Sequence, residues 1–260
     1  MRSSNPVLTR LTPETNAGYR SAPSTGYPSD PSYPSVVAPA TTERMTIDDV
    51  VVRTVALLTL TAVSAAAAWI LIPDQYTFAA WIGAAIVGLI LGFAITLARI
   101  TNPALIATYA VVEGVFVGMV SKYYESFFDG IVLQAALGTF GVFFIMAVLY
   151  KFQVIRATPG FIRGVIGATV GVFVVILLNW VLSLFNVNTH LRDGSPLAIG
   201  FSLFIIVIAA LNFILDFHLV EEGIRQGAPR NFAWLCAVGI LIGLIWVYIE
   251  ILRLISYFRD

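Results

Sequence analysis

The sequence predicts an all-α, polytopic membrane protein folded as a bundle of seven transmembrane helices. Of its 260 residues, 58% are hydrophobic and only 12% are charged, whereas a soluble domain keeps about a quarter of its residues charged. The mean hydropathy is +0.88. Seven stretches separated by short polar joins each reach the roughly 20 apolar residues that a helix needs to cross a bilayer core. The lipid bilayer is therefore the first expected partner.

The chain divides into two parts by composition. Residues 1–44 are rich in Pro, Ser, Thr, Gly and Tyr, and such a segment cannot bury enough apolar surface to offset the entropy of ordering. We expect a disordered cytoplasmic tail there. Because no apolar core follows Met1, we expect no signal peptide. Residues 45–260 form the predicted membrane domain.

Hydropathy places the spanning helices along the membrane domain in order. We expect them near Val50–Ile72, Thr77–Ala98, Pro103–Val120, Ile131–Phe152, Phe161–Phe185, Leu197–Val220 and Trp234–Phe258. The joins between several of them are short, which forces neighbouring helices to run antiparallel. The predicted arrangement is an up-and-down bundle.

The distribution of lysine and arginine predicts the orientation. With a cytoplasmic N-terminus, eight basic residues fall at the inner ends of the helices and four at the outer ends. The inner set is Arg44, Arg53, Arg99, Lys151, Arg156, Arg163, Arg225 and Arg230, and the outer set is Lys122, Arg192, Arg253 and Arg259. This asymmetry favours an N-terminus inside the cell.

Glycines spaced four residues apart predict close contacts between helices. Small residues at this spacing let helix backbones approach each other within a membrane. The pairs are Gly88 and Gly92, Gly114 and Gly118, Gly160 and Gly164, Gly167 and Gly171, and Gly239 and Gly243. Their spread over most of the helices predicts a tightly packed bundle.

Two carboxylates stand far from the ends of the last two predicted helices, Asp216 in the sixth and Glu250 in the seventh. Ionisable side chains inside a membrane are costly and usually face a partner or a hydrated cavity. Arg253 follows Glu250 by three residues and can pair with it on the same helix face. The pattern predicts a site involving these helices.

Two further charged residues admit two interpretations each. Glu113, with Tyr109 one turn before it, is either a third acid lining an interior cavity or a hydrogen-bonded residue that ties helices together. Arg99, at the end of the second predicted helix, is either an interfacial charge or a cation partner for Asp216.

Several function classes conflict with the sequence. A retinal protein needs a lysine in the last helix, and Trp234–Phe258 has none. A metal hydrolase needs clustered ligands, but His190 and His218 are the only histidines. The formal net charge is zero, so no basic surface predicts nucleic-acid binding, and the lone Cys236 cannot form an internal disulfide. We expect neither an enzyme nor a bound cofactor.

From about Val50 to its end, the chain resembles the bacterial branch of the Bax inhibitor-1 (transmembrane Bax inhibitor motif) family. The resemblance rests on Pro103–Gly118 around Glu113, on the triplet Leu215-Asp216-Phe217 and on Trp246–Leu254 around Glu250. It implies a central last helix and a calcium leak pathway gated by pH in the bacterial cytoplasmic membrane. Asp216 and Glu250 would then share a proton and make transient contacts to permeant calcium.

The resemblance also implies an arginine on the second helix that bridges to the two acids. In this sequence the corresponding position lies closer to Thr96 than to Arg99. Measured from the turn near Gly227 at 1.5 Å per residue, Asp216 lies about 16 Å and Glu250 about 30 Å along their helices. Direct pairing therefore requires a kink at Gly239 or Gly243. Without it, the expected pairs are Asp216 with Arg99, or Glu113 with Glu250.

The implied mechanism follows from charge. Two carboxyls held close in a low-dielectric site cannot both ionise easily, so they take up and release a proton as a unit. Deprotonation would open a path lined by carboxylate oxygens, which are the ligands that calcium prefers. The alternative is a regulatory membrane protein that modulates a membrane quality-control protease or a stress response through the tail and the loop Lys151–Arg163.

Overall fold

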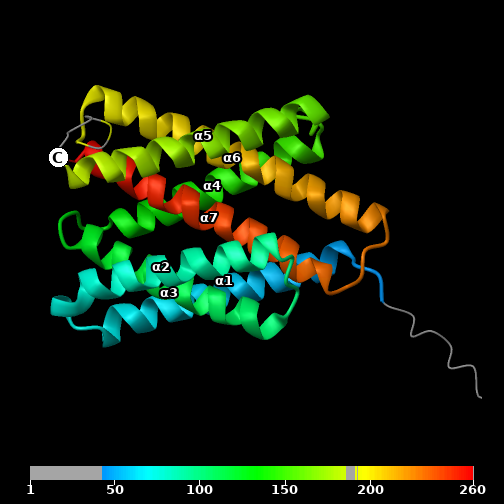
Figure 1. Cartoon of the computed structure of the whole chain (residues 1–260), viewed down its shortest axis with the longest axis horizontal. Coiled ribbons are helices and arrows are strands. Elements are labelled where there is room, and N and C mark those ends of the chain that lie inside the picture. Colours follow the sequence, from blue (N-terminus) through cyan, green and yellow to red (C-terminus); the bar gives the residue numbers. More distant parts are fainter. Residues whose placement is uncertain (1–42, 186–190, 192, 260) are drawn as a thin grey trace, which may run out of the picture. The chain divides into compact units, whose positions relative to one another are not determined.

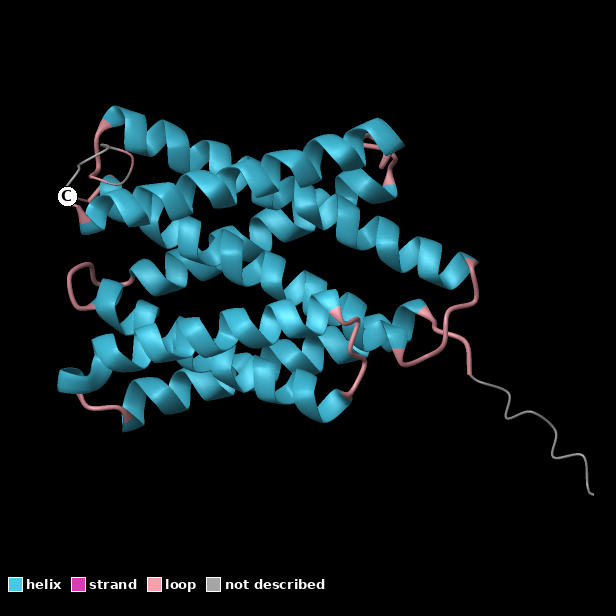
Figure 2. Cartoon of the chain, in the orientation of Figure 1, coloured by secondary structure: helices cyan, strands magenta, loops and turns pink. Residues whose placement is uncertain are grey.

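A computed structural model describes residues 43–185, 191 and 193–259 of the chain. It is a bundle of seven long helices, as predicted (Figure 1, Figure 2), and each helix is long and apolar enough to cross a membrane. The elements are α1 (Ile47–Leu71), the single 3-10 turn η2 (Asp74–Tyr76), α2 (Thr77–Leu97), α3 (Pro103–Glu125), α4 (Ile131–Lys151), α5 (Pro159–Leu184), α6 (Pro196–Arg225) and α7 (Phe232–Tyr257). The predicted tail up to residue 42, His190 and Arg192 lie outside the described residues.

Two predicted helix ends are wrong, both by five residues. Helix α3 continues to Glu125 instead of Val120, and α6 continues to Arg225 instead of Val220. The predicted ends were placed where the apolar run gives way to polar side chains, but both helices continue beyond that point. In α3, Lys122 pairs with Asp74, the first residue of η2, and the last turn of α6 is supported by the ion pair between Arg225 and Glu222 within the helix.

Local sequence signals fix several helix starts. Thr46 caps α1 in a capping box with Asp49. Asn102, Thr158 and Ser195 cap α3, α5 and α6 with their side-chain oxygens, and each is followed by a proline at the first helical position. Caps of this kind satisfy backbone N–H groups that would otherwise lack partners.

Helix α7 runs through the middle of the bundle, as the family resemblance implies. In Figure 1 it lies between α1, α2 and α3 on one side and α4, α5 and α6 on the other. It packs against α1, α3, α4 and α6, and a larger share of it is buried than of any other described helix. Helix α5 packs mainly on α6 and is the most exposed of the seven.

Three of the five predicted glycine pairs lie at tight helix contacts. A Cβ atom on Gly118 of α3 would stand 2.5 Å from the backbone oxygen of Ala65 in α1, and one on Gly114 would stand 2.5 Å from that of Thr61. The same crossing is stabilised by the Ser64 hydroxyl, which donates to the Val111 carbonyl at 2.7 Å. The parallel helices α1 and α3 therefore approach each other closely although α2 separates them in sequence.

The prediction is wrong for the two pairs in α5. Nothing lies within 4 Å of a Cβ added to any of these glycines, which are Gly160, Gly164, Gly167 and Gly171. The spacing that allows a close approach is present in α5, but α6 covers a different side of the helix.

We expect Gly118→Ala to destabilise the bundle because the new methyl group would press on the α1 backbone, which cannot rotate away. Overpacking of this kind costs about 1–3 kcal/mol. The free energy of unfolding in mixed micelles measures the change. The matched control is Gly167→Ala on the open face of α5, which should be neutral or slightly stabilising. Equal losses in the two variants would contradict the packing described for α1 and α3.

Candidate functional site

Asp216 lies in the seam where α6 crosses α7. Its Oδ1 atom would stand 3.0 Å from a Cβ atom on Gly239 of α7, and one turn earlier Phe213 packs against Gly243 in the same way, at 2.8 Å. The predicted glycine pair of α7 thus makes room for an acidic and an aromatic side chain of α6. A carboxyl group is held against the backbone of the central helix.

The structure does not bring Asp216 and Glu250 together. Asp216 meets α7 at Gly239, and Glu250 follows Gly239 by eleven residues, which is about 16 Å along an α-helix. Helix α7 is α-helical without interruption from Phe232 to Tyr257, so no unwound turn brings the two carboxyl groups closer together. The shared-proton arrangement implied by the resemblance is therefore wrong for these two residues.

Arg99 is also separated from Asp216. It is exposed and lies just beyond the end of α2 with a left-handed backbone, at φ 49°. Within residues 43–185, 191 and 193–259, no ion pair joins Arg99 to Asp216. Of the two interpretations of Arg99, the structure fits the interfacial charge.

Glu250 and Arg253 form the ion pair that their spacing predicts. The Arg253 guanidinium donates to Glu250 Oε1. The Glu250 side chain is 3% exposed and that of Arg253 is 16% exposed, so both charges have left water. Tyr124 of α3 lies near Arg253, and five residues before Arg253 the Tyr248 hydroxyl shares a hydrogen bond with Ser121 of α3 at 2.6 Å. The ion pair itself lies within α7, and the Tyr248–Ser121 hydrogen bond beside it connects α7 to α3.

Glu113 fits parts of both of its interpretations. Its carboxyl group lies close to the Tyr109 side chain on the same helix, and its Oε1 would stand 2.7 Å from a Cβ on Gly88 of α2. Glu113 also lines a cavity of about 230 Å³ together with side chains of α7 that include Trp246 and Ile249. It ties helices together and faces an interior space.

The three acids occupy separate places along the bundle. Among the residues that the structure describes, no three His, Cys, Asp or Glu side chains gather closely enough to hold a metal ion. Within the described part of the chain, neither Asp216 nor Glu250 therefore belongs to a cluster of three such side chains.

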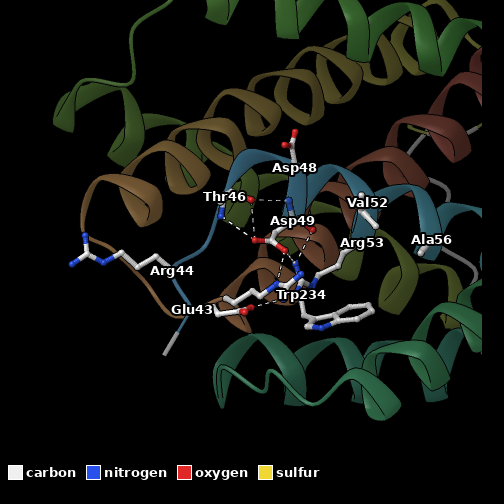
Figure 3. Close-up of a pocket in the computed structure, with 10 residues that line it drawn as sticks. Glu43, Arg44, Thr46, Asp48, Asp49, Val52, Arg53, Ala56 and Trp234 are labelled. Carbon is white, nitrogen blue, oxygen red and sulfur yellow. Dashed lines mark hydrogen bonds and ion pairs between the residues drawn. The ribbon is translucent and has the colours of Figure 1, made fainter. Parts of the chain in front are cut away.

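A cluster of charges that the sequence analysis did not identify joins the start of α1 to the turn between α6 and α7 (Figure 3). Its centre is Asp49, whose side chain is 11% exposed. Asp49 accepts hydrogen bonds from Arg230 Nε at 2.7 Å and from the Thr46 hydroxyl at 2.9 Å, and it pairs with Arg53 at 2.9 Å. The Arg53 guanidinium lies 5.3 Å from the ring centre of Trp234. We call Glu43, Asp49, Arg53, Arg230 and Trp234 the clamp.

Backbone hydrogen bonds reinforce the clamp. The Met45 N–H donates to the Ala228 carbonyl at 2.9 Å, and the Arg230 N–H donates to the Glu43 carbonyl at 2.8 Å. The Met45 side chain is 2% exposed. The Asp49 and Glu43 carboxylates hold the pKa of Arg230 above its ordinary value. The segment before α1 is thus fixed to the turn between α6 and α7. The capping-box spacing of Thr46 and Asp49 signals only the start of α1.

Removing one member of the buried pair should destabilise the protein more than removing both. Arg253→Met leaves the Glu250 carboxylate buried beside an apolar side chain, and loss of one partner of a buried ion pair costs about 3–5 kcal/mol. The double variant with Glu250→Leu should regain much of this stability, measured as the free energy of unfolding in micelles. A double variant less stable than Arg253→Met would contradict a compensating pair.

Breaking the clamp should loosen the segment before α1. Arg230→Gln removes the partner of Glu43 and Asp49, so we expect faster amide hydrogen exchange at Met45 and residue 230. The control is Arg225→Gln, because Arg225 pairs with Glu222 inside α6. Unchanged exchange at Met45 in the Arg230 variant would mean that the backbone bonds alone fix the segment.

Comparisons with known proteins agree with the resemblance in the sequence. A search of curated proteins finds no match to the chain. The model of one protein family, described as Bax inhibitor 1 like, matches residues 5–260. This match takes in all seven helices, the three membrane-embedded acids and the clamp. The protein is therefore a multi-pass membrane protein that belongs to the Bax inhibitor 1 like family.

Proposed function

We propose that this protein is a pH-sensitive leak pathway for cations, with calcium as the expected ion and no enzymatic activity. The observation that carries the proposal is the carboxyl group of Asp216, lodged between α6 and the central helix at Gly239. Its protonation decides whether a net charge is present in that seam. A change of charge at a helix contact inside a membrane is large enough to shift the contact.

The gating step differs from a shared proton between two acids. Neutral Asp216 is compatible with close packing of α6 on α7, because the seam is otherwise made of apolar groups such as Phe213. Loss of the proton places a negative charge there, and the charge requires water or a cation beside it. Parting of the seam near Gly239 would admit both, so flux should rise when Asp216 ionises.

Glu113 provides a second contact point for a cation. It lines the cavity between α3 and α7, and an ionised carboxylate there presents oxygen ligands that suit calcium. The buried Glu250–Arg253 pair is already neutralised. We assign it a latching role toward α3, and Asp216 and Glu113 the roles of sensor and ion contact.

Orientation and location are part of the same proposal. The excess of lysine and arginine at the ends that carry Arg44, Lys151 and Arg225 favours a cytoplasmic position for that side of the bundle. The seam at Asp216 is then about 14 Å from the cytoplasmic end of α6, counted along nine residues. A change in cytoplasmic pH would reach it more directly than a change outside. The proposed membrane is the bacterial cytoplasmic membrane.

Asp216→Asn should flatten the pH dependence of calcium flux, because asparagine fills the same space but cannot ionise. The measurement is calcium entry into proteoliposomes over a range of pH, with Asp48→Asn as the control because Asp48 is an exposed acid at the start of α1. Gly239→Ala keeps the acid but crowds it, so it should shift the pH profile without abolishing it.

The outcomes separate the parts of the proposal. An unchanged pH profile in Asp216→Asn removes Asp216 as the sensor, even if the protein conducts. Absence of calcium flux in the wild-type protein at every pH removes the leak pathway itself. Loss of pH dependence in Asp48→Asn as well would indicate a general effect of surface charge.

A further inference from the structure

The end of the bundle where α4 and α6 finish contains a cavity that the proposed ion pathway does not use. It has a volume of about 680 Å³ and lies between the last turns of α4, the loop to α5, the last turns of α6 and the first residue of α1. Its lining combines basic, polar and apolar side chains. A mixed lining of this kind suits an amphiphilic ligand.

The charge of the cavity favours an anion. Lys151 and Arg156 line it, both are exposed, and neither forms an ion pair within the described part of the chain. The one acid in the lining is Glu221, which accepts a hydrogen bond from the Tyr150 hydroxyl. Lys151, Arg156 and Glu221 together give the lining two positive charges and one negative charge, which is a net charge of +1. Two cations without protein partners can therefore face a ligand.

The apolar surroundings favour a lipid over a free ion. Phe217, Val220 and Ile224 of α6 form one wall. On α4, Val148 and Phe144 precede Lys151 by three and seven residues and so lie on the same helix face, and they are 50% and 64% exposed. An exposed apolar track thus runs from the cationic site toward the centre of the membrane. A pair of acyl chains can follow this track while a headgroup stays at Lys151.

The loop at the edge of the cavity has the composition of a membrane interface. Phe152 and Val154, which lie between Lys151 and Arg156 in the sequence, are 72% and 68% exposed. Gln153 between them has a left-handed backbone, at φ 54°, and its side chain lines the cavity. Apolar side chains next to unpaired cations are stable where lipid tails meet headgroups.

We propose that this cavity binds the phosphate headgroup of an anionic glycerophospholipid, with Lys151 and Arg156 as the phosphate contacts and the exposed face of α4 as the acyl-chain contact. Basic pockets between transmembrane helices are suited to such headgroups. The site is separate from the Asp216 seam and does not depend on ion conduction. It would fix lipid against the cytoplasmic ends of α4 and α6.

The test is native mass spectrometry of the full chain in detergent, titrated with phosphatidylglycerol or with phosphatidylcholine of the same acyl chains. The wild type should retain phosphatidylglycerol preferentially. Each cation near a membrane surface contributes about 1 kcal/mol to binding of anionic lipid, so Lys151→Gln with Arg156→Gln should weaken phosphatidylglycerol binding about 30-fold. Phosphatidylcholine binding should not change, which also shows that the variant is folded.

Two matched variants control for charge. Arg99→Gln with Arg163→Gln removes two exposed cations that do not line the cavity, and it should keep the lipid preference. Lys151→Arg with Arg156→Lys exchanges the two cations and should keep it too. Equal binding of the two lipids by the wild type, or equal losses in both glutamine double variants, would overturn the proposal.

Two further ligands distinguish the source of the anion. Inorganic phosphate that displaces phosphatidylglycerol at millimolar concentration would indicate a site for a soluble anion and would overturn the lipid assignment. Binding of a soluble polyglutamate peptide in place of lipid would assign the cavity to an acidic protein segment. We expect that neither competitor displaces phosphatidylglycerol. We also expect that lipid binding is lost only in the variant with glutamine at both Lys151 and Arg156.

Discussion

Close approach of backbones around the central helix is the constraint on which this structure depends. Inside a membrane, lipid tails are as apolar as leucine, so burial alone does not drive helices together. Contacts at Gly114 and Gly118 bring α1 onto α3, and contacts at Gly239 and Gly243 bring α6 onto α7. With no side chain at these positions, neighbouring helices approach within van der Waals distance over several turns. The remaining helices are arranged around these two crossings.

The same glycines determine where acids can be placed. Gly88 of α2 leaves room for the Glu113 carboxyl and Gly239 leaves room for that of Asp216. Glu250 is accommodated by another means, since Arg253 neutralises it one turn further along α7. Three membrane-embedded acids are therefore held in three different environments. This difference supports giving them separate roles in the proposed mechanism.

The helices could be predicted from sequence because each is encoded by its own residues. Apolar length and caps are local properties, and most predicted helix bounds agree with the structure within three residues. The faces of the helices are not local. The glycines of α5 have the same spacing as those of α3, yet α3 meets α1 while the α5 glycines meet no other helix in the described structure. Spacing shows that a helix permits a contact, and only the arrangement of its neighbours decides whether one forms.

In the candidate site, too, contacts within one helix could be predicted and contacts between helices could not. Glu250 and Arg253 lie within one turn of α7, and their pairing was predicted from their spacing. The relation of Asp216 to Glu250 depends on the depth at which two separate helices cross. The rise per residue along a helix predicted different depths for the two acids, and in the structure Asp216 meets α7 eleven residues before Glu250. The clamp joins Asp49 to Arg230, which are 181 residues apart. Their sequence neighbourhoods contain no sign of this contact.

That separation has a consequence for the order of biogenesis. Ribosomes add about 5–20 residues per second, so Arg230 is made roughly 10 to 35 s after Asp49 at these rates. During this interval the first helix is inserted with only Thr46 and Arg53 available to its carboxylate. Pairing with Arg230 must wait until the final hairpin has been translated. Closure of this end of the molecule is therefore a late event whose earliest time is fixed by the speed of translation.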